Sequence, residues 1–141
     1  MATLQIEKDF GYVLLAAVAP VFLNFWQMSR IGAQRKKFGV PYPEMYSDKH
    51  PHFNCYQRVH QNTLENVHFF TITLLVAGLR NPCWAAGFGA TWLVGRIAYT
   101  IGYSTGNPKA RIPGFIISII GAQIPLLFMS VRTAAGILGW F

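Results

Sequence analysis

A cation, an amide and a carboxylate follow one another at helical spacing where an apolar stretch of the sequence begins. Arg58, Asn62 and Glu65 are separated by four and then three residues, so a helix places them on one face. Glu65 lies about one turn inside the apolar stretch, where a carboxylate is costly unless it faces protein or water. The spacing therefore predicts a polar site built into a membrane-embedded helix.

A second polar set has similar spacing in the next apolar stretch. Arg96, Tyr99 and Tyr103 are separated by three and then four residues and also share a helix face. Arg96 lies deep enough in its stretch to need a partner, and Glu65 is the expected one. The two tyrosines add two phenol hydroxyls beside this expected ion pair.

Further cations belong to the same end of these two stretches. Arg35 precedes the first set, and Lys109 and Arg111 follow the second. Such a collection suits a small zwitterionic ligand with more than one carboxylate. Arginine binds carboxylates in a bidentate geometry, and Glu65 is suited to an ammonium group.

Each group also has a purely structural interpretation. Arg35 and Arg58 are consistent with contacts to lipid headgroups, and the two tyrosines with interfacial aromatic residues. Glu65 and Arg96 are consistent with an ion pair that only joins two helices. The four histidines and two cysteines show no spacing typical of a metal site or a disulfide framework, so we expect no metal.

Four apolar stretches are long enough to carry these residues across a bilayer, which takes about 20 residues of helix. They cover approximately residues 10–28, 62–79, 83–103 and 112–138. Turn signals separate them, such as Arg80-Asn81-Pro82 after the second stretch. The sequence therefore predicts an all-α polytopic membrane protein, a bundle of four transmembrane helices in a single domain over residues 1–141.

The composition also favours lipid as the surrounding medium. Of the 141 residues, 52% are hydrophobic and 12% are charged, which is about half the charged fraction of a soluble domain. The net charge of +7 comes from basic residues between apolar stretches, so nucleic acid is not the expected partner. The loops after the first and third stretches are the basic ones, which predicts that they face the cytosol and that both termini face away from it.

The residues of the predicted site resemble those of a known family. The string His60-Gln61-Asn62-Thr63-Leu64-Glu65, preceded by Phe53-Asn54-Cys55 and Gln57-Arg58, resembles the type-3 microsomal glutathione S-transferases. These belong to the membrane-associated proteins in eicosanoid and glutathione metabolism (MAPEG). Further matches are Gly95-Arg96, Tyr99, Gly102-Tyr103 and Thr105-Gly106. The resemblance extends over nearly the whole chain.

The resemblance implies a homotrimer of four-helix subunits that binds glutathione between neighbouring subunits and uses no metal. The positions that match glutathione-binding residues are Arg35, Arg58, His60, Asn62, Glu65, Tyr99 and Tyr103. In the family an arginine after the third span stabilises the glutathione thiolate, and Arg111 is our choice for that catalytic residue. Lys109 is its rival, because this loop differs by one residue from that of the leukotriene-forming members.

The expected function is that of a membrane glutathione transferase or peroxidase. It would activate glutathione as a thiolate, then conjugate it to a lipophilic electrophile or reduce a lipid hydroperoxide. Leukotriene-C synthase activity is a further expectation from the resemblance. We expect a multi-pass protein of the endoplasmic reticulum membrane, in contact with membrane lipid, with its active site toward the cytosol. The alternatives are a non-catalytic lipid-binding protein of the same family, and a small transporter or structural membrane subunit.

Overall fold

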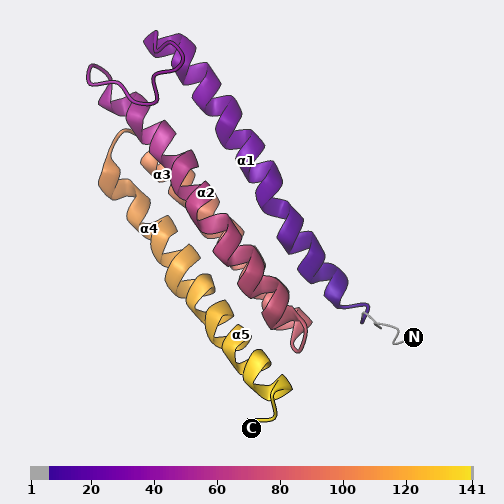
Figure 1. Ribbon diagram of the computed structural model, residues 1–141. Coiled ribbons are helices and arrows are strands. Elements are labelled where there is room, and N and C mark those ends of the chain that lie inside the picture. The colour runs from indigo at the N-terminus through magenta and orange to yellow at the C-terminus, as the bar shows by residue number, and fades with distance from the viewer. Residues whose placement is uncertain (1–6, 141) are drawn as a thin grey trace.

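The computed structural model describes residues 7–140, which form helices joined by loops (Figure 1). The first three are α1 (Phe10–Phe38), α2 (Pro51–Gly78) and α3 (Pro82–Tyr103). The fourth long helix is built from the 3₁₀ turn η1 (Pro108–Arg111), α4 (Ile112–Phe115), the π-helical η2 (Ile116–Gln123) and α5 (Ile124–Ile137). The predicted all-α class and the count of four long helices are confirmed for this part of the chain. Residues 1–6 and 141 of the predicted domain lie outside the described residues.

Two of the helices extend well beyond the predicted spans. α1 continues from residue 28 to Phe38, and α2 begins at Pro51 rather than at residue 62. The apolar stretches mark only those parts that could lie in lipid, whereas local signals set the helix ends. Arg35, Lys36 and Lys37 occupy the last turn of α1, where cations are favourable, and Gly39 ends it in the left-handed conformation. Pro51 is suited to the first turn of α2.

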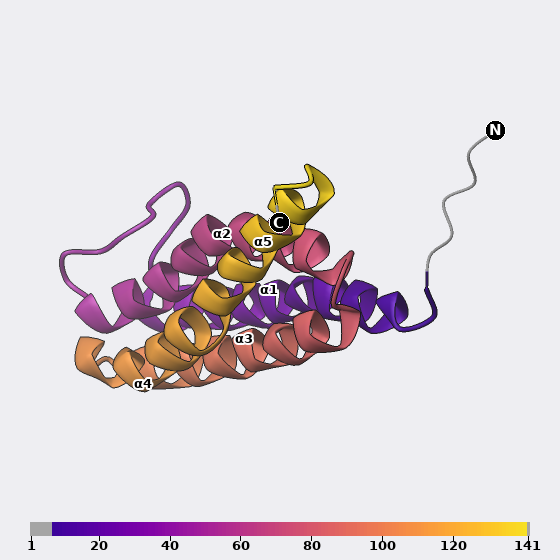
Figure 2. The same cartoon turned by 90° about the horizontal axis from the view of Figure 1, so that it is seen from below.

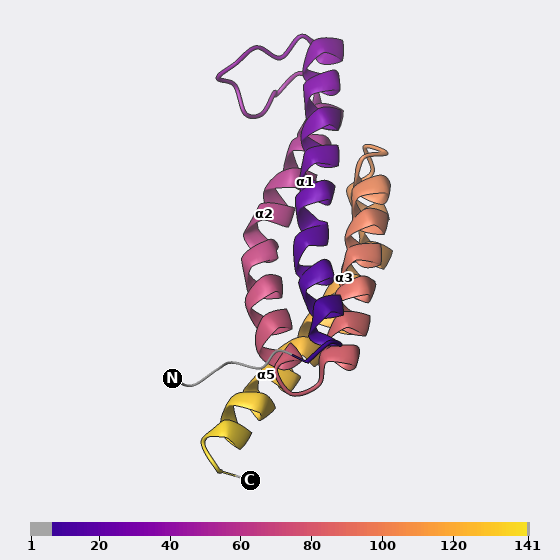
Figure 3. The same ribbon diagram turned by 90° about the vertical axis from the view of Figure 1, so that its right-hand side faces the viewer.

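The helices α2 and α3 form the centre of the molecule. α1 packs on one side of this pair, and the helix from η1 to α5 packs on the other (Figures 1 and 3). This last helix lies against α3 at its start and against α2 at its end, so it crosses the pair obliquely (Figure 2). The loops after α1 and α3 lie at one end of the bundle, and the α2–α3 turn, the start of α1 and the end of α5 lie at the other (Figure 1).

Aromatic and small residues bring α2, α3 and the last helix together. Phe70 and Trp92 stack at 4.0 Å between ring centroids and are fully buried. Gly95 faces the backbone of Ser118, and Gly114 faces the backbone of Tyr99; a Cβ at either glycine would overlap that backbone. The close approach that glycine permits between membrane helices therefore holds the start of the last helix against α3, next to the predicted site.

Among the described residues, α1 and the helix from Pro108 to Ile137 are long and apolar enough to cross a membrane. Large apolar side chains are exposed on both, including Phe22, Phe25 and Phe128. α2 and α3 are not among these helices: α2 carries Arg58 and Glu65, and α3 carries Arg96 together with several glycine and tyrosine residues. The apolar helices support a membrane protein, and the four complete spans stay a prediction.

Candidate functional site

Arg96 is the centre of a buried polar network that joins three helices. Its side chain is fully buried; Nη1 donates to Asn62 Oδ1 at 3.0 Å and Nη2 to Thr63 Oγ1 at 2.7 Å. Gln27 Nε2 from α1 donates to Thr63 Oγ1 at 3.0 Å and to Thr100 Oγ1 at 2.8 Å. The guanidinium carbon lies 4.4 Å from the ring centroid of Tyr99. These contacts compensate in part for the burial of a charge.

The expected ion pair between Glu65 and Arg96 is not formed. Arg96 points at the edge of α2 that carries Asn62 and Thr63, and Glu65 is exposed and accepts a 3.4 Å hydrogen bond from Gln61. Neutral oxygens from α2 therefore take the role that the sequence suggested for a carboxylate. Glu65 remains free to meet a ligand.

Tyr99, Tyr103 and Arg111 form a contact chain between α3 and η1. The two tyrosine rings meet edge to face at 5.6 Å between centroids, and both side chains are buried. The Arg111 guanidinium lies 4.8 Å from the Tyr103 ring centroid, and its charge also acts on Tyr99. The turn that precedes Arg111 is fixed by Asn107, whose Oδ1 accepts from the backbone N–H of Lys109 at 3.0 Å.

Arg58 places a second positive charge near this end of α3. It is exposed on α2, and its charge acts on both Tyr99 and Tyr103. The Tyr46 hydroxyl, followed by the nearby Glu65 carboxylate, raises the pKa of Arg58, so this guanidinium stays charged. The predicted residues Arg58, Asn62, Tyr99, Tyr103 and Arg111 thus lie in one region, with Glu65 beside it.

Arg35 and His60 lie elsewhere in the chain. Arg35 Nη1 donates to the carbonyl oxygen of Glu44 at 2.7 Å, and its guanidinium lies between the rings of Tyr42 and Phe53, at 4.3 and 5.3 Å from their centroids. His60 lines a cleft of about 370 Å³ between α1 and α2, together with Val21, Asn24, Phe25, Met28 and Leu64. Neither residue is seen to contact Tyr99, Tyr103 or Arg111 within this chain.

Cys55 is the one cysteine next to this region, and its surroundings make it a poor nucleophile. The side chain is buried in a cluster with Val59, Tyr99 and Tyr103. Burial raises the pKa of the Cys55 thiol, and the charge of Arg111 opposes this only in part. Since the thiolate is the reactive form, Cys55 is not suited to covalent catalysis.

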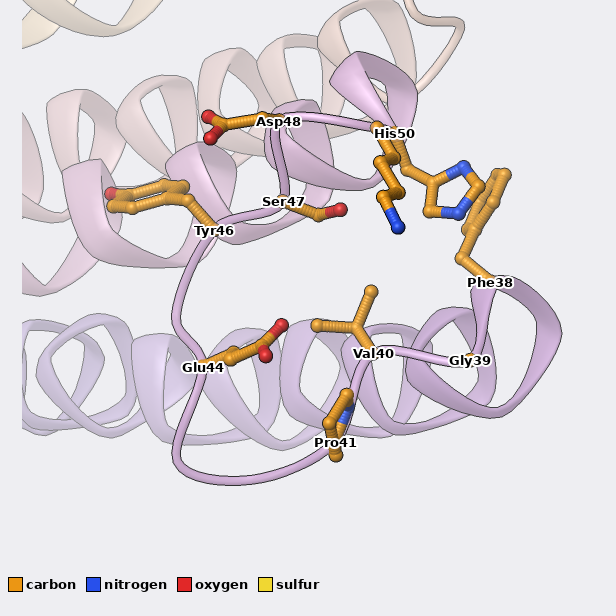
Figure 4. Close-up of a pocket in the computed structure, with 10 residues that line it drawn as sticks. Phe38, Gly39, Val40, Pro41, Glu44, Tyr46, Ser47, Asp48 and His50 are labelled. Carbon is orange, nitrogen blue, oxygen red and sulfur yellow. The ribbon is translucent and has the colours of Figure 1, made fainter.

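The loop between α1 and α2 encloses a separate cavity of about 420 Å³ (Figure 4). Figure 4 shows the Glu44 carboxylate directed into it, whereas the side chains of Tyr46 and Asp48 point away. Among residues 7–140, no group of three or more His, Cys, Asp or Glu side chains is placed to hold a metal ion. The metal-free site stays a prediction.

Three residues of this region were missing from the predicted site. Thr63 and Gln27 hold Arg96 and its neighbours, and Tyr46 lies beside Arg58. The sequence held a signal for Gln27, since it lies three residues after Asn24 and a helix places both amides on one face of the first apolar stretch; Gln27 is buried. Thr63 and Tyr46 had no comparable signal, because their partners come from other segments.

Comparison with known proteins places this arrangement in a family. The model of the MAPEG family matches residues 13–135. A search of curated proteins finds an uncharacterized protein of Synechocystis sp., sll1147, which is 38% identical over 106 residues, covering 70% of this chain and 75% of that protein.

Two similar proteins carry a functional name. Microsomal glutathione S-transferase 2 of Homo sapiens is 36% identical over 112 residues, covering 76% of this chain and 73% of that protein. Microsomal glutathione S-transferase 2 of Bos taurus is 33% identical over 134 residues, covering 92% of this chain and 86% of that protein. The likeness extends over most of each relative, and the residues 13–135 matched by the family model include the segments that carry the candidate site.

Proposed function

This chain belongs to the MAPEG family, and on that premise we propose that it is a membrane glutathione transferase that also reduces lipid hydroperoxides. The names of the two mammalian relatives support glutathione as the co-substrate. The named relatives are of type 2, and membership of type 3 is a narrower form of the proposal. Leukotriene-C synthase activity is a narrower form of the same proposal.

The observation that carries the proposal is that two guanidinium groups lie near a pair of buried phenols. Arg111 lies over the Tyr103 ring, and the charge of Arg58 acts on both tyrosines. Positive charge held at a fixed place lowers the pKa of a thiol that binds there. We assign this role to Arg111, since its guanidinium lies 4.8 Å from the Tyr103 ring centroid.

The remaining predicted residues fit the other groups of glutathione. Arg35 and Arg58 would bind its two carboxylates, and the exposed Glu65 its ammonium group. The Oδ1 of Asn62 is held by Arg96, which leaves the amide nitrogen to donate to the peptide. Tyr99 and Tyr103 would line the place of the sulfur.

A second copy of the chain would complete this site. Arg58 and Glu65 are open to the surroundings, whereas Arg35 and His60 lie apart from Tyr103. If all four bind one ligand, Arg35 and His60 come from a neighbouring subunit. This supports a glutathione site between subunits. From the family resemblance we further propose that the assembly is a homotrimer in the endoplasmic reticulum membrane, with its basic loops toward the cytosol.

The chemistry then belongs to the sulfur of glutathione. Its thiolate attacks an electrophilic carbon, forms the C–S bond and expels the leaving group. With a hydroperoxide it attacks the distal oxygen, so an S–O bond forms as the O–O bond breaks, and the lipid leaves as an alcohol after protonation. The glutathione sulfenic acid then reacts with a second glutathione to give the disulfide and water. No side-chain nucleophile takes part, and the protein contributes position and electric field.

Turnover of purified protein with glutathione tests the proposal. We expect conjugation of an aryl halide and reduction of a fatty-acid hydroperoxide. Arg111→Ala should lower kcat by about 10²- to 10³-fold, the usual loss for a group that stabilises developing charge. Lys109→Ala is the matched control and should keep near-normal turnover. Absence of turnover with several electrophiles and hydroperoxides would instead favour a non-catalytic lipid-binding protein.

A further inference from the structure

A second cavity lies at the end of the bundle opposite to Arg111. It has a volume of about 420 Å³ and opens between the α2–α3 turn, the first turn of α3 and the last part of α5. Its lining residues are Arg80, Asn81, Trp84, Phe128, Met129, Arg132 and Thr133. The proposed glutathione site uses none of them.

The cavity carries uncompensated positive charge. Both Arg80 and Arg132 are exposed, and none of its described lining residues is acidic. Asp9, an acid near the start of α1, contacts the Cys83 sulfur at 3.5 Å and does not line the cavity. Asn81 precedes α3 without capping it through its side chain, so its amide is free, and the N-terminus of α3 adds partial positive charge. An anion is the ligand that this lining favours.

The buried wall of the cavity contains a hydroxyl without a partner. Thr133 is 2% exposed, and its Oγ1 makes no hydrogen bond. Other buried hydroxyls in these helices donate to the carbonyl four residues earlier, as Thr63, Thr100 and Ser130 do. A buried hydroxyl left unpaired costs stability. Thr133 lines the cavity, so a turn of its covered hydroxyl toward an acceptor oxygen bound there would remove that cost.

The rim of the cavity is apolar. Trp84 and Phe128 are each 69% exposed and flank the two arginines. Along α5, the neighbouring side chains of Ile124, Leu127 and Val131 are also exposed, which gives an acyl chain a surface to follow. Aromatic residues beside cations are typical of the level where lipid headgroups lie.

We propose that this cavity binds a phosphate-bearing anion, and that an anionic phospholipid supplies it. Arg80 and Arg132 bind the phosphate oxygens, Thr133 donates its hydroxyl proton to one of them, and the acyl chains lie along α5. A soluble phosphate ester would share the polar contacts but not the apolar ones.

Lipid retention by the purified full-length protein tests the charge requirement. The protein in detergent is mixed with phosphatidic acid, phosphatidylcholine or inorganic phosphate, and bound species are counted by native mass spectrometry. We expect phosphatidic acid to be retained at least about fivefold better than phosphatidylcholine, and each of Arg80→Gln and Arg132→Gln to weaken its retention about fivefold. Lys8→Gln removes an exposed cation near the same end, outside the cavity, and should change nothing.

Thr133→Val tests the hydroxyl without changing the side-chain shape. In plain detergent its Tm should equal or exceed that of the native protein, since the hydroxyl has no partner to lose. With phosphatidic acid its gain in Tm should be smaller. The comparison separates ligand binding from folding, because a damaged fold would lower Tm in both conditions.

The outcomes are distinct. If millimolar inorganic phosphate displaced phosphatidic acid, the cavity would still be a phosphate site, but its ligand would be a soluble phosphate and not a lipid. Equal retention by the native protein and the Arg80/Arg132 double variant would overturn the proposal, as would an equal loss in Lys8→Gln. Neither result bears on glutathione turnover, which depends on the opposite end of the bundle.

Discussion

At the scale of single residues, the arginines of this chain differ in what surrounds them. Arg96 is fully buried and held by Asn62 and Thr63, whereas Arg58 is exposed. The Arg96 guanidinium donates to two side-chain oxygens of α2 and so positions its neighbours, whereas the exposed Arg58 can meet a ligand. We therefore assign Arg96 to the orientation of Asn62, and Arg58 and Arg111 to glutathione itself.

Replacement of Arg96 tests this division. Arg96→Ala should lower the stability of the fold by several kcal/mol, because Asn62 and Thr63 lose a charged hydrogen-bond donor. It should also weaken glutathione binding by about tenfold, since a neutral hydrogen bond from a freely rotating Asn62 would be lost. Thermal unfolding and calorimetric titration measure the two effects.

The matched variant is Asn62→Ala, which should weaken glutathione binding to a similar extent with a smaller loss of Tm. If Arg96→Ala bound glutathione normally, the positioning role of Arg96 would be wrong.

His60 gives a prediction about pH. Burial lowers the pKa of His60 below its ordinary value of 6.5, so the folded protein favours the neutral ring. The unfolded chain therefore protonates His60 at a higher pH than the folded protein does. For this reason the folded protein keeps its full stability above pH 6.5 and loses part of it as the pH falls below that value. His60→Gln should therefore flatten the decline of Tm between pH 7 and pH 5. An identical decline in both proteins would show that His60 does not contribute to it.

The residue scale also shows where prediction from sequence stops. Helical spacing placed Asn62 and Glu65 on one face of α2, and Arg96, Tyr99 and Tyr103 on one face of α3, because i, i+3 and i+4 positions share a face. The predicted partner of Arg96 was wrong, since spacing within a helix does not say which side chain of another helix it meets. Glu65 was predicted for its opposite charge, but Asn62 and Thr63 accept from Arg96 with neutral oxygens.

At the scale of elements, the turn into the last helix places Arg111. α3 ends at Tyr103, and η1 returns along it so closely that Gly102 faces the Ala110 backbone carbonyl. Only a residue without a Cβ fits there. The apolar pattern predicted both helices, but it held no information on this return or on the helical extensions outside the predicted spans. Those depend on Gly39, Pro51 and Asn107, which act locally.

Gly102→Ala tests whether this close approach matters for catalysis. The added Cβ would overlap the Ala110 carbonyl, push η1 away from α3 and move Arg111 off Tyr103. A misplacement of about 1 Å can cost about 10²-fold in rate, so kcat should fall while glutathione binding falls much less. Gly87→Ala is the control on the same helix, where a Cβ meets nothing within 4 Å. Equal activity of the two variants would contradict the role of this turn.

At the scale of the whole molecule, one chain leaves the glutathione site unfinished. α1 and the last helix cover opposite sides of the α2–α3 pair (Figure 1), and Arg58 and Glu65 remain open at the surface. Arg35 and His60 face other parts of the same chain. The family likeness indicated an assembly, and the separation of these residues within one subunit gives that assembly a role in binding.

Mixed oligomers test this role. Arg35→Ala and Arg58→Ala should each lose glutathione turnover when expressed alone. If Arg35 of one copy and Arg58 of another bind the same ligand, co-expression should restore part of the activity, because some sites then hold both arginines. Co-expression of Arg58→Ala with Glu65→Ala should restore nothing, since both residues lie on α2 and act from the same copy. Restoration in both pairs, or in neither, would contradict a site shared in this way.

The state of the glutathione sulfur tests the central claim most directly. The ultraviolet absorbance of the thiolate, measured as a difference spectrum when glutathione is added to the purified protein at neutral pH, reports whether positive charge has removed the thiol proton. The account predicts a thiolate band with the native protein and with Lys109→Ala, and its loss with Arg111→Ala at saturating glutathione. An undiminished band in Arg111→Ala would contradict it.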